Sequence, residues 1–214
     1  MEKPVIIFGT GPLSLAALNI FSDNNIVVFG LLDDDKKLHG TEIMDATILS
    51  TTDDEEFLQI IGAKCEAFIA FENISIKKSI VKLLNEKRKV MPVNALHGNS
   101  HIAKSAEIGH GNLIDAGTVI GAQSVIGNHC ILLSNSTVES MVTIGDYVQL
   151  GPGVTIGSGV SIGDDAFVGA GVVIVSGVTI GKGARIGAGS VVVSDVKKGD
   201  TVFGNPAKTI ETPS

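Results

Sequence analysis

The sequence is poor in aromatic residues, with no tryptophan, one tyrosine and eight phenylalanines among 214 residues. It is rich instead in glycine, with 26 residues, and in small and branched aliphatic side chains. A chain of this length can bury a substantial core and can form one or two domains. Because few rings are present to fill a core, the composition favours stacked β structure filled by isoleucine and valine over a ring-rich sandwich.

An excess of positive charge is also missing, since the net charge is −7 at pH 7. Phosphates require a basic surface, so we expect no binding to nucleic acid. No apolar run reaches the roughly 18 residues of a membrane helix, and no secretion signal is recognised. Cys65 and Cys130 lie far apart in apolar surroundings. We therefore expect a cytoplasmic protein with two buried thiols and no membrane insertion.

Residues 1–97 alternate short apolar runs with helical patterns. Buried strands are predicted at 4–9, 26–32 and 66–71, and a last short strand at 90–93. Helices are predicted after the first run, where proline suits a first helical turn, after the acidic residues 53–56, and over 74–89. This alternation predicts a small parallel sheet of the Rossmann type.

From about residue 101 an aliphatic residue recurs every six positions. Sixteen successive positions from Ile102 to Val192 are aliphatic, with no insertion or deletion. The position after each is glycine in ten of the sixteen units. Such a period is typical of a parallel β-helix in which three hexads form one triangular coil. The aliphatic residues are expected to point inward and to stack 18 residues apart, while glycine permits tight corners.

The two ends of the repeat resemble a known family. Residues 96–109, LHGNSHIAKSAEIG, resemble its entry into the helix, and residues 180–208 resemble its closing coil and exit segment, which ends here in GNPAK. The chain thus resembles the hexapeptide-repeat sugar acyltransferases of the sialic-acid O-acetyltransferase and bacillosamine N-acetyltransferase type. The resemblance implies an α/β Rossmann-like sugar-nucleotide domain at 1–97 and an all-β left-handed parallel β-helix at 98–214.

The resemblance also implies a chemistry. Such proteins are homotrimers that bind acetyl-CoA as co-substrate in a cleft between neighbouring helices. A corner histidine is the general base, beside an acidic residue. When the family's catalytic segment is aligned on the Ile-Gly pair at 144–145, Glu139 matches the acidic residue and Ser140 takes the place of the histidine. Three further family positions differ here: Met141, Leu133 and Gln149.

Glu139 and Ser140 are the catalytic candidates by position. A serine hydroxyl alone is a poor base, so a structural role for both residues is the alternative. His110 and His129 share one corner on adjacent coils, which resembles the zinc site of γ-class carbonic anhydrases but lacks a third histidine. We expect both histidines to be exposed corner residues, and we expect no metal.

Candidate ligand-binding residues fall in both halves. An acidic pair after the second strand suits a ribose hydroxyl, whereas Pro12 removes an amide donor and Phe71 replaces a family glycine, which narrows the pocket. The substrate-binding candidates are Gly9, Thr10, Gly11, Asp33, Asp34 and Asn73. The acetyl-CoA candidates are Gly151, Gly169, Ala170, Gly187, Ala188, Pro206 and Lys208, with Lys182 and Arg185 as further charges for the phosphates. Each group also has a structural alternative. Gly9 and Gly11 can form a tight turn that binds no ligand, the aspartates can be solvated, and the glycines of the repeat can serve only to form corners.

Three functions follow from these observations. The first is an acetyl-CoA-dependent acyltransferase acting on an amine or hydroxyl of a sugar or nucleotide sugar. The second is a catalytically inactive trimeric scaffold of the same fold that binds a small ligand or a partner, because the expected base is missing. A metal-dependent hydratase is a distant third.

Overall fold

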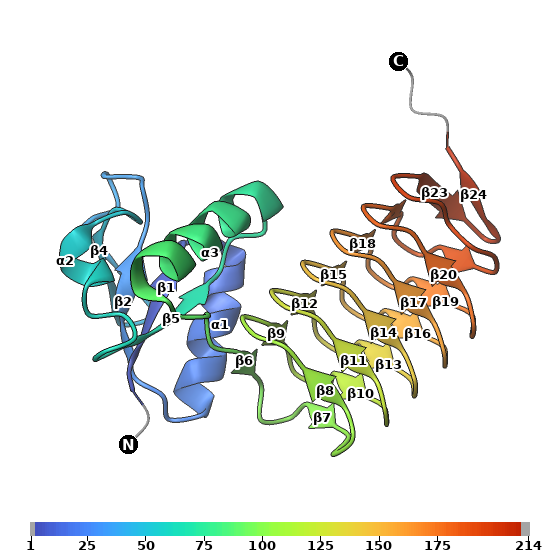
Figure 1. Ribbon diagram of the computed structural model, residues 1–214, viewed down its shortest axis with the longest axis horizontal. Helices are drawn as coiled ribbons and strands as arrows, with labels where there is room; N and C mark the ends of the chain where they lie inside the picture. Colours follow the sequence, from blue (N-terminus) through green and yellow to red (C-terminus); the bar gives the residue numbers. More distant parts are fainter. Residues whose placement is uncertain (1–2, 211–214) are drawn as a thin grey trace. The chain divides into compact units, whose positions relative to one another are not determined.

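The computed structural model describes residues 3–210, and the chain divides into two compact units, Met1–Gly98 and Asn99–Ser214. The first unit is the α/β part drawn from blue to green in Figure 1, and the second is the stack of triangular coils drawn from green to red. Among residues 3–210, no helix is both long and apolar enough to cross a membrane.

A five-stranded sheet with the order β3-β4-β2-β1-β5 forms the centre of the first unit. The pairs β4–β2, β2–β1 and β1–β5 are parallel, and β3 pairs with β4 antiparallel. The strands of this unit are β1 (Val5–Phe8), β2 (Val28–Leu32), β3 (Glu42–Ile43), β4 (Ala46–Ser50), β5 (Glu66–Ile69) and the short β6 (Ala95–Leu96). The helices are α1 (Pro12–Asp23), α2 (Glu55–Leu58) and α3 (Ile74–Arg88).

These elements form where the local sequence favours them. Pro12 begins α1, and the side chains of Asp54 and Asn73 accept hydrogen bonds from the first turns of α2 and α3. Strand β1 is buried along its whole length, and the rings of Phe21 and Phe68 meet edge to face at 5.6 Å between centroids. The result is a sheet whose loops at the carboxyl ends of the parallel strands are held by capped helices.

The sequence predictions for this unit hold with one exception. The predicted buried strands correspond to β1, β2 and β5, but residues 90–93 form no strand, and the short β6 that follows them is not part of the five-stranded sheet. The hairpin of β3 and β4 was not predicted. Its turn residues Met44 and Asp45 both have positive φ, 48° and 64°, as a two-residue hairpin turn requires.

The second unit is a parallel β-helix with two-residue strands on three faces. Face 1 contains β7 (His101–Ile102), β10 (Val119–Ile120), β13 (Thr137–Val138), β16 (Thr155–Ile156), β19 (Val173–Ile174) and β22 (Val191–Val192). Face 2 contains β8 (Glu107–Ile108), β11 (Val125–Ile126), β14 (Thr143–Ile144), β17 (Ser161–Ile162) and β20 (Thr179–Ile180). Face 3 contains β9 (Leu113–Ile114), β12 (Ile131–Leu132), β15 (Gln149–Leu150), β18 (Phe167–Val168), β21 (Arg185–Ile186) and the closing hairpin β23 (Thr201–Gly204) and β24 (Ala207–Thr209).

The interior of this helix is filled as the repeat predicts. From Ile114 to Val192, every inward aliphatic residue is at most 2% exposed, and from Ile114 to Ile174 each pairs in register with the residue 18 positions on. Buried polar residues share the interior with them, and their hydrogen-bonding groups are used. For example, the Asn112 side chain donates to the Gly127 carbonyl (2.9 Å) and accepts from the Cys130 amide (2.7 Å).

Glycine is favoured at the corners between faces for two different reasons. From Ile108 to Ile186, the third residue after each inward one takes a left-handed conformation, and it is glycine at Gly111, Gly117, Gly153, Gly159, Gly171, Gly177, Gly183 and Gly189. The repeat's own glycine, directly after the inward residue, is required instead by packing between coils. A Cβ on Gly151 would lie 2.5 Å from the amide nitrogen of Ala170 on the next coil. The corner after face 1 is called edge 1–2 below, and edges 2–3 and 3–1 follow in the same way.

Candidate functional site

Glu139 and Ser140 lie on edge 1–2, between β13 and β14. Glu139 is exposed, and its carboxylate accepts hydrogen bonds from the Ser158 hydroxyl (2.7 Å) and the Ser158 amide (3.1 Å) on the next coil. Ser140 is partly buried, and its carbonyl accepts from the amide of Gly159 (3.1 Å). Edge 1–2 therefore presents a carboxylate held in place by the neighbouring coil, next to a hydroxyl.

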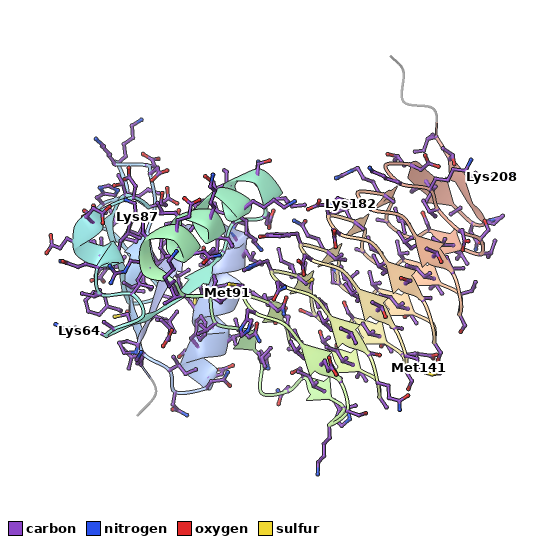
Figure 2. All side chains as sticks on the ribbon, in the orientation of Figure 1. Lys64, Lys87, Met91, Met141, Lys182 and Lys208 are labelled. Atoms are coloured by element: carbon purple, nitrogen blue, oxygen red, sulfur yellow. The ribbon has the colours of Figure 1, made fainter. Side chains whose placement is uncertain are left out.

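Met141 completes this corner in an unusual state. It has a φ of 60° and its side chain is 58% exposed. A left-handed conformation costs a residue with a side chain about 1–2 kcal/mol. Five successive corners have a left-handed residue with a side chain: Gln123, His129, Asn135, Met141 and Tyr147. Figure 2 labels Met141 on the outside of the coil stack.

The other two family positions are not brought to this corner. Leu133 lies on edge 3–1 and Gln149 lies on face 3, so both are separated from Ser140 by whole faces of the same helix. Within one copy of the chain, the positions that match the family's catalytic segment therefore do not converge.

The predicted acetyl-CoA residues form a separate column on edge 3–1. Gly151, Gly169 and Gly187 stack there on successive coils, and the neighbouring Ala170 and Ala188 are exposed. The column ends at Phe203, whose ring lies over Gly187, since a Cβ on that glycine would be 2.3 Å from the ring. The exposed Pro206 and Lys208 belong to the hairpin of β23 and β24, and Figure 2 labels Lys208.

The two charges expected beside Lys208 have partners within the chain. Lys182 is paired with Asp164 (3.2 Å) and Asp165 (3.7 Å), and the hydrogen bond that Lys182 donates to Asp164 is the main cause that raises the pKa of Lys182. The guanidinium of Arg185 lies 4.7 Å from the ring centroid of Phe167 on face 3. Neither side chain is thus the simple solvated charge that we expected.

The histidines of edge 2–3 correct one prediction. His110 is exposed as expected, but His129 is 3% exposed, and its ring stacks on Tyr147 with 4.9 Å between centroids. The two residues are joined through the backbone, because the His129 amide donates to the His110 carbonyl (2.7 Å). Burial raises the pKa of Tyr147, and the carboxylates of Asp146 and Asp165 raise it further. Among residues 3–210, no three histidine, cysteine or acidic side chains are grouped as metal ligands.

In the first unit, the turn after β1 is tied to the loop after β2. The Thr10 hydroxyl donates to a carboxylate oxygen of Asp33 (2.7 Å), and the Ser14 hydroxyl donates to the carbonyl of Gly9 (2.8 Å). Gly11 is exposed at the start of α1, with no atom within 4 Å of where its Cβ would be. The predicted substrate residues Thr10 and Asp33 therefore lie together.

The remaining two candidates have structural partners. One carboxylate oxygen of Asp34 accepts from the amide and the hydroxyl of Thr52, both at 2.9 Å. The Asn73 side chain accepts from the first amides of α3, as a helix cap. A cavity of about 360 Å³ also lies in this unit, between residues such as Val5, Phe21 and Val93, but none of the predicted site residues lines it.

Comparisons with known proteins agree with this architecture. The family described as bacterial transferase hexapeptide (six repeats) matches residues 105–140, 123–158, 141–175 and 159–194. No protein matches in a search of curated sequences. Among solved structures, a histidine variant of GDP-perosamine N-acetyltransferase from Caulobacter crescentus, in complex with CoA and GDP-perosamine, is 27% identical with a TM-score of 0.88, and the match covers 99% of both chains.

Two further structures match over almost the whole chain. WeeI from Acinetobacter baumannii is 28% identical with a TM-score of 0.85, and the match covers 98% of this chain and 100% of that one. The acetyltransferase domain of PglB from Neisseria gonorrhoeae, in complex with acetyl coenzyme A, has a TM-score of 0.88 with the same coverage, and at 23% identity it supports the fold alone. The predicted fold, a Rossmann-like α/β unit followed by a left-handed parallel β-helix, is confirmed. The chain's repeat matches the bacterial transferase hexapeptide family over residues 105–194, and in the order of its two units the chain is similar over almost its whole length to a sugar N-acetyltransferase of known structure.

Proposed function

We propose that this protein transfers an acetyl group from acetyl-CoA to an amine or hydroxyl of a sugar or nucleotide sugar. The observation that carries the proposal is the match over 99% of both chains to an N-acetyltransferase in complex with CoA and GDP-perosamine. The acceptor's nitrogen or oxygen attacks the thioester carbonyl, the carbon–sulfur bond breaks, and CoA leaves as a thiolate. The acceptor's proton must pass to a base, and CoA is protonated to the thiol.

The carboxylate of edge 1–2 is the group that we assign to this proton. Glu139 is exposed to an incoming acceptor, and its hydrogen bonds to Ser158 fix where the carboxylate points. Ser140 is then a neighbour that can hydrogen-bond to the acceptor but does not act as a base. A Glu139→Gln substitution is expected to lower kcat about 100-fold with little change in thermal midpoint. A Ser176→Ala control on the same edge is expected to keep the activity.

We also propose that the working form is a homotrimer whose sites are shared between copies. In one copy, edge 3–1 with the donor residues and edge 1–2 with Glu139 lie on opposite sides of face 1. A second copy that places its edge 3–1 against edge 1–2 of the first would unite them. Face 1 and its edge offer apolar side chains for such a contact, because Val119, Val173 and Val193 are 38%, 39% and 51% exposed.

A mixing experiment tests the shared site. Glu139→Gln disables edge 1–2, and Ala170→Tyr is expected to block edge 3–1 with a bulky ring. Each variant alone should be inactive, whereas trimers formed by refolding or co-expressing both should regain part of the activity. A monomeric mass by light scattering, or mixtures that stay as inactive as their parents, would contradict the shared site.

Binding of the donor is the primary test of the function. Isothermal titration of acetyl-CoA into the full chain is expected to give saturable binding, and mass spectrometry is expected to find an acetylated sugar among a panel of acceptors. Absence of binding at millimolar concentration would end the proposal. Binding without transfer to any acceptor would favour the inactive scaffold. We place the reaction in the cytoplasm, in keeping with the two buried thiols of Cys65 and Cys130.

A further inference from the structure

The turn after the first strand of a Rossmann-type sheet is where a pyrophosphate can bind. Small residues at the turn let the pyrophosphate approach the backbone closely, and the first amides of the following helix point at the pyrophosphate. In this chain the residues that follow β1 are Gly9, Thr10 and Gly11, and α1 begins at Pro12. Its neighbours decide whether a diphosphate can approach this turn.

A ring covers one side of the turn. Gly9 is buried, and Phe71, in the loop after β5, packs against it. A Cβ on Gly9 would lie 3.3 Å from the ring's Cζ atom and 3.4 Å from the Ala70 carbonyl. Because Gly9 has no side chain, the Phe71 ring can pack against it. Less space therefore remains at this turn for a phosphate.

The first turn of α1 also offers few donors. Pro12 has no amide hydrogen. The Ser14 amide donates to the Gly11 carbonyl (2.9 Å), and the Ser14 hydroxyl donates to the Gly9 carbonyl (2.8 Å). A phosphate arriving here would therefore meet fewer hydrogen-bond donors than a glycine-rich turn supplies.

A fixed negative charge stands at the same turn. The Thr10 hydroxyl donates to one oxygen of Asp33 (2.7 Å), and the amide of Asp35 donates to the other (3.0 Å). The loops that follow β2, β4 and β5 add further acidic groups, so that this end of the sheet carries six carboxylates and two lysines. They are Asp33, Asp34, Asp35, Asp53, Asp54 and Glu72, with Lys36 and Lys37. The summed field repels anions and favours neutral or cationic ligands.

We propose that Phe71 and the Thr10–Asp33 pair determine specificity by excluding a nucleoside diphosphate from this turn, so that the acceptor is a sugar or amino sugar that carries no diphosphate. The inference rests on the proposed function and selects one of its two acceptor classes. The two effects act together, because the Phe71 ring occupies space that a diphosphate would need and the Asp33 carboxylate repels its negative charge.

The test is a titration of GDP and of UDP into the full chain, in the absence of acetyl-CoA. Wild type is expected to show no binding at millimolar concentration. The variant Phe71→Ala with Asp33→Asn opens the space and removes the charge while an amide keeps the bond from Thr10. We expect its association constant for at least one of the two nucleotides to rise about tenfold or more above the detection limit.

The matched control is Phe29→Ala with Asp45→Asn, which removes one ring and one carboxylate from the same unit but none from the turn or from the loops that follow β2, β4 and β5. It should bind neither nucleotide. Circular dichroism and the thermal midpoint report whether each variant is folded. If the double variant does not fold, Asp33→Asn alone keeps the shape of the side chain, and it should gain a smaller but measurable affinity.

The inference would be overturned by tight binding of GDP or UDP to wild type, or by a folded double variant that gains no affinity for either nucleotide. Acetyl transfer adds a second readout, since wild type should acetylate glucosamine, galactosamine or mannosamine in preference to their UDP-linked forms. Preference for the UDP-linked sugars would also overturn it. Because the nucleotide titrations need neither acetyl-CoA nor turnover, they succeed or fail independently of the proposed acyl transfer.

Discussion

Two stretches of the same β-helix place different residues at the same kind of corner. From Gln123 to Tyr147, five successive left-handed corners carry side chains, whereas from Gly153 to Gly189 every one except Asp165 is glycine. The strands, the inward residues and the backbone ladder do not differ between the two stretches. The inward positions therefore specify the helix, and the corner residues can vary at a local energetic cost.

The contrast has a functional meaning because two of the side-chain-bearing corners, Gln123 and Met141, lie on the same edge as Glu139 and Ser140. Left-handed residues other than glycine are kept where the surrounding structure holds them and are found often at functional sites. Met141 is the clearest case, since it is both left-handed and 58% exposed, so burial does not explain its side chain. We interpret this stretch as the part of the helix in which sequence has been adapted to a ligand or a partner copy.

The largest expected effect breaks the coil itself. Gly151→Ala places a Cβ 2.5 Å from the amide nitrogen of Ala170, which is closer than real Cβ contacts allow, and the coils must move apart. We expect the free energy of unfolding to fall by about 2–4 kcal/mol, measured by urea unfolding. Gly153→Ala is the matched control, because its Cβ would meet nothing within 4 Å, and only the left-handed conformation costs about 1 kcal/mol. Equal losses in the two variants would contradict the packing requirement.

A smaller effect is expected at the exposed corner. Met141→Gly removes the left-handed strain without removing buried contacts, so the free energy of unfolding should rise by about 1 kcal/mol. Tyr147→Gly relieves the same strain but loses the stacked contact with His129, and it should not stabilise. Differential scanning calorimetry of the two variants compares them directly. A destabilised Met141→Gly variant would show that the side chain packs in the assembled protein.

The smallest expected effect is a pH dependence of stability that arises from Lys182 on edge 2–3. The pKa of Lys182 is raised above its ordinary value of 10.5, mainly by the hydrogen bond that its ammonium group donates to Asp164. The folded state therefore binds this proton more tightly than the unfolded state, so the stabilisation is present below about pH 10.5 and is lost as the pH rises through the folded pKa. Tyr147 contributes in the same direction, because its pKa is also raised. The thermal midpoint of Lys182→Gln should fall less steeply above pH 10 than that of wild type, and parallel curves would contradict the pairing.

How far the sequence predicts this molecule differs between its parts. The period of six fixes every inward residue of the helix, because one uninterrupted phase leaves each side chain a single possible direction. The pairing of Lys182 with Asp164 follows from the same arithmetic, since the two are 18 residues apart, but the prediction treated that lysine as solvated. The period also led to a wrong interpretation of the glycine that follows each inward residue. We expected it to permit tight corners, whereas the structure shows that it permits close packing between adjacent coils.

Features that depend on non-repeating contacts could not be predicted. His129 has the corner position of an exposed residue, and nothing in the hexad pattern indicates that it is buried against Tyr147. The β3–β4 hairpin is joined by Met44 and Asp45, which lack the usual Asn-Gly signal of such a turn. The bond from Thr10 to Asp33 joins two loops 23 residues apart, and only the parallel arrangement of β1 and β2 brings them together.

The most direct test of the central claim is acceptor-dependent release of CoA from acetyl-CoA, followed side by side for wild type and Ser140→His. If edge 1–2 is the centre of acyl transfer, both proteins release CoA only when an amino sugar is present. The added histidine base should then raise kcat/KM by about 100-fold. If neither protein releases CoA with any acceptor, or if the substitution leaves the rate unchanged, acyl transfer does not take place at this edge.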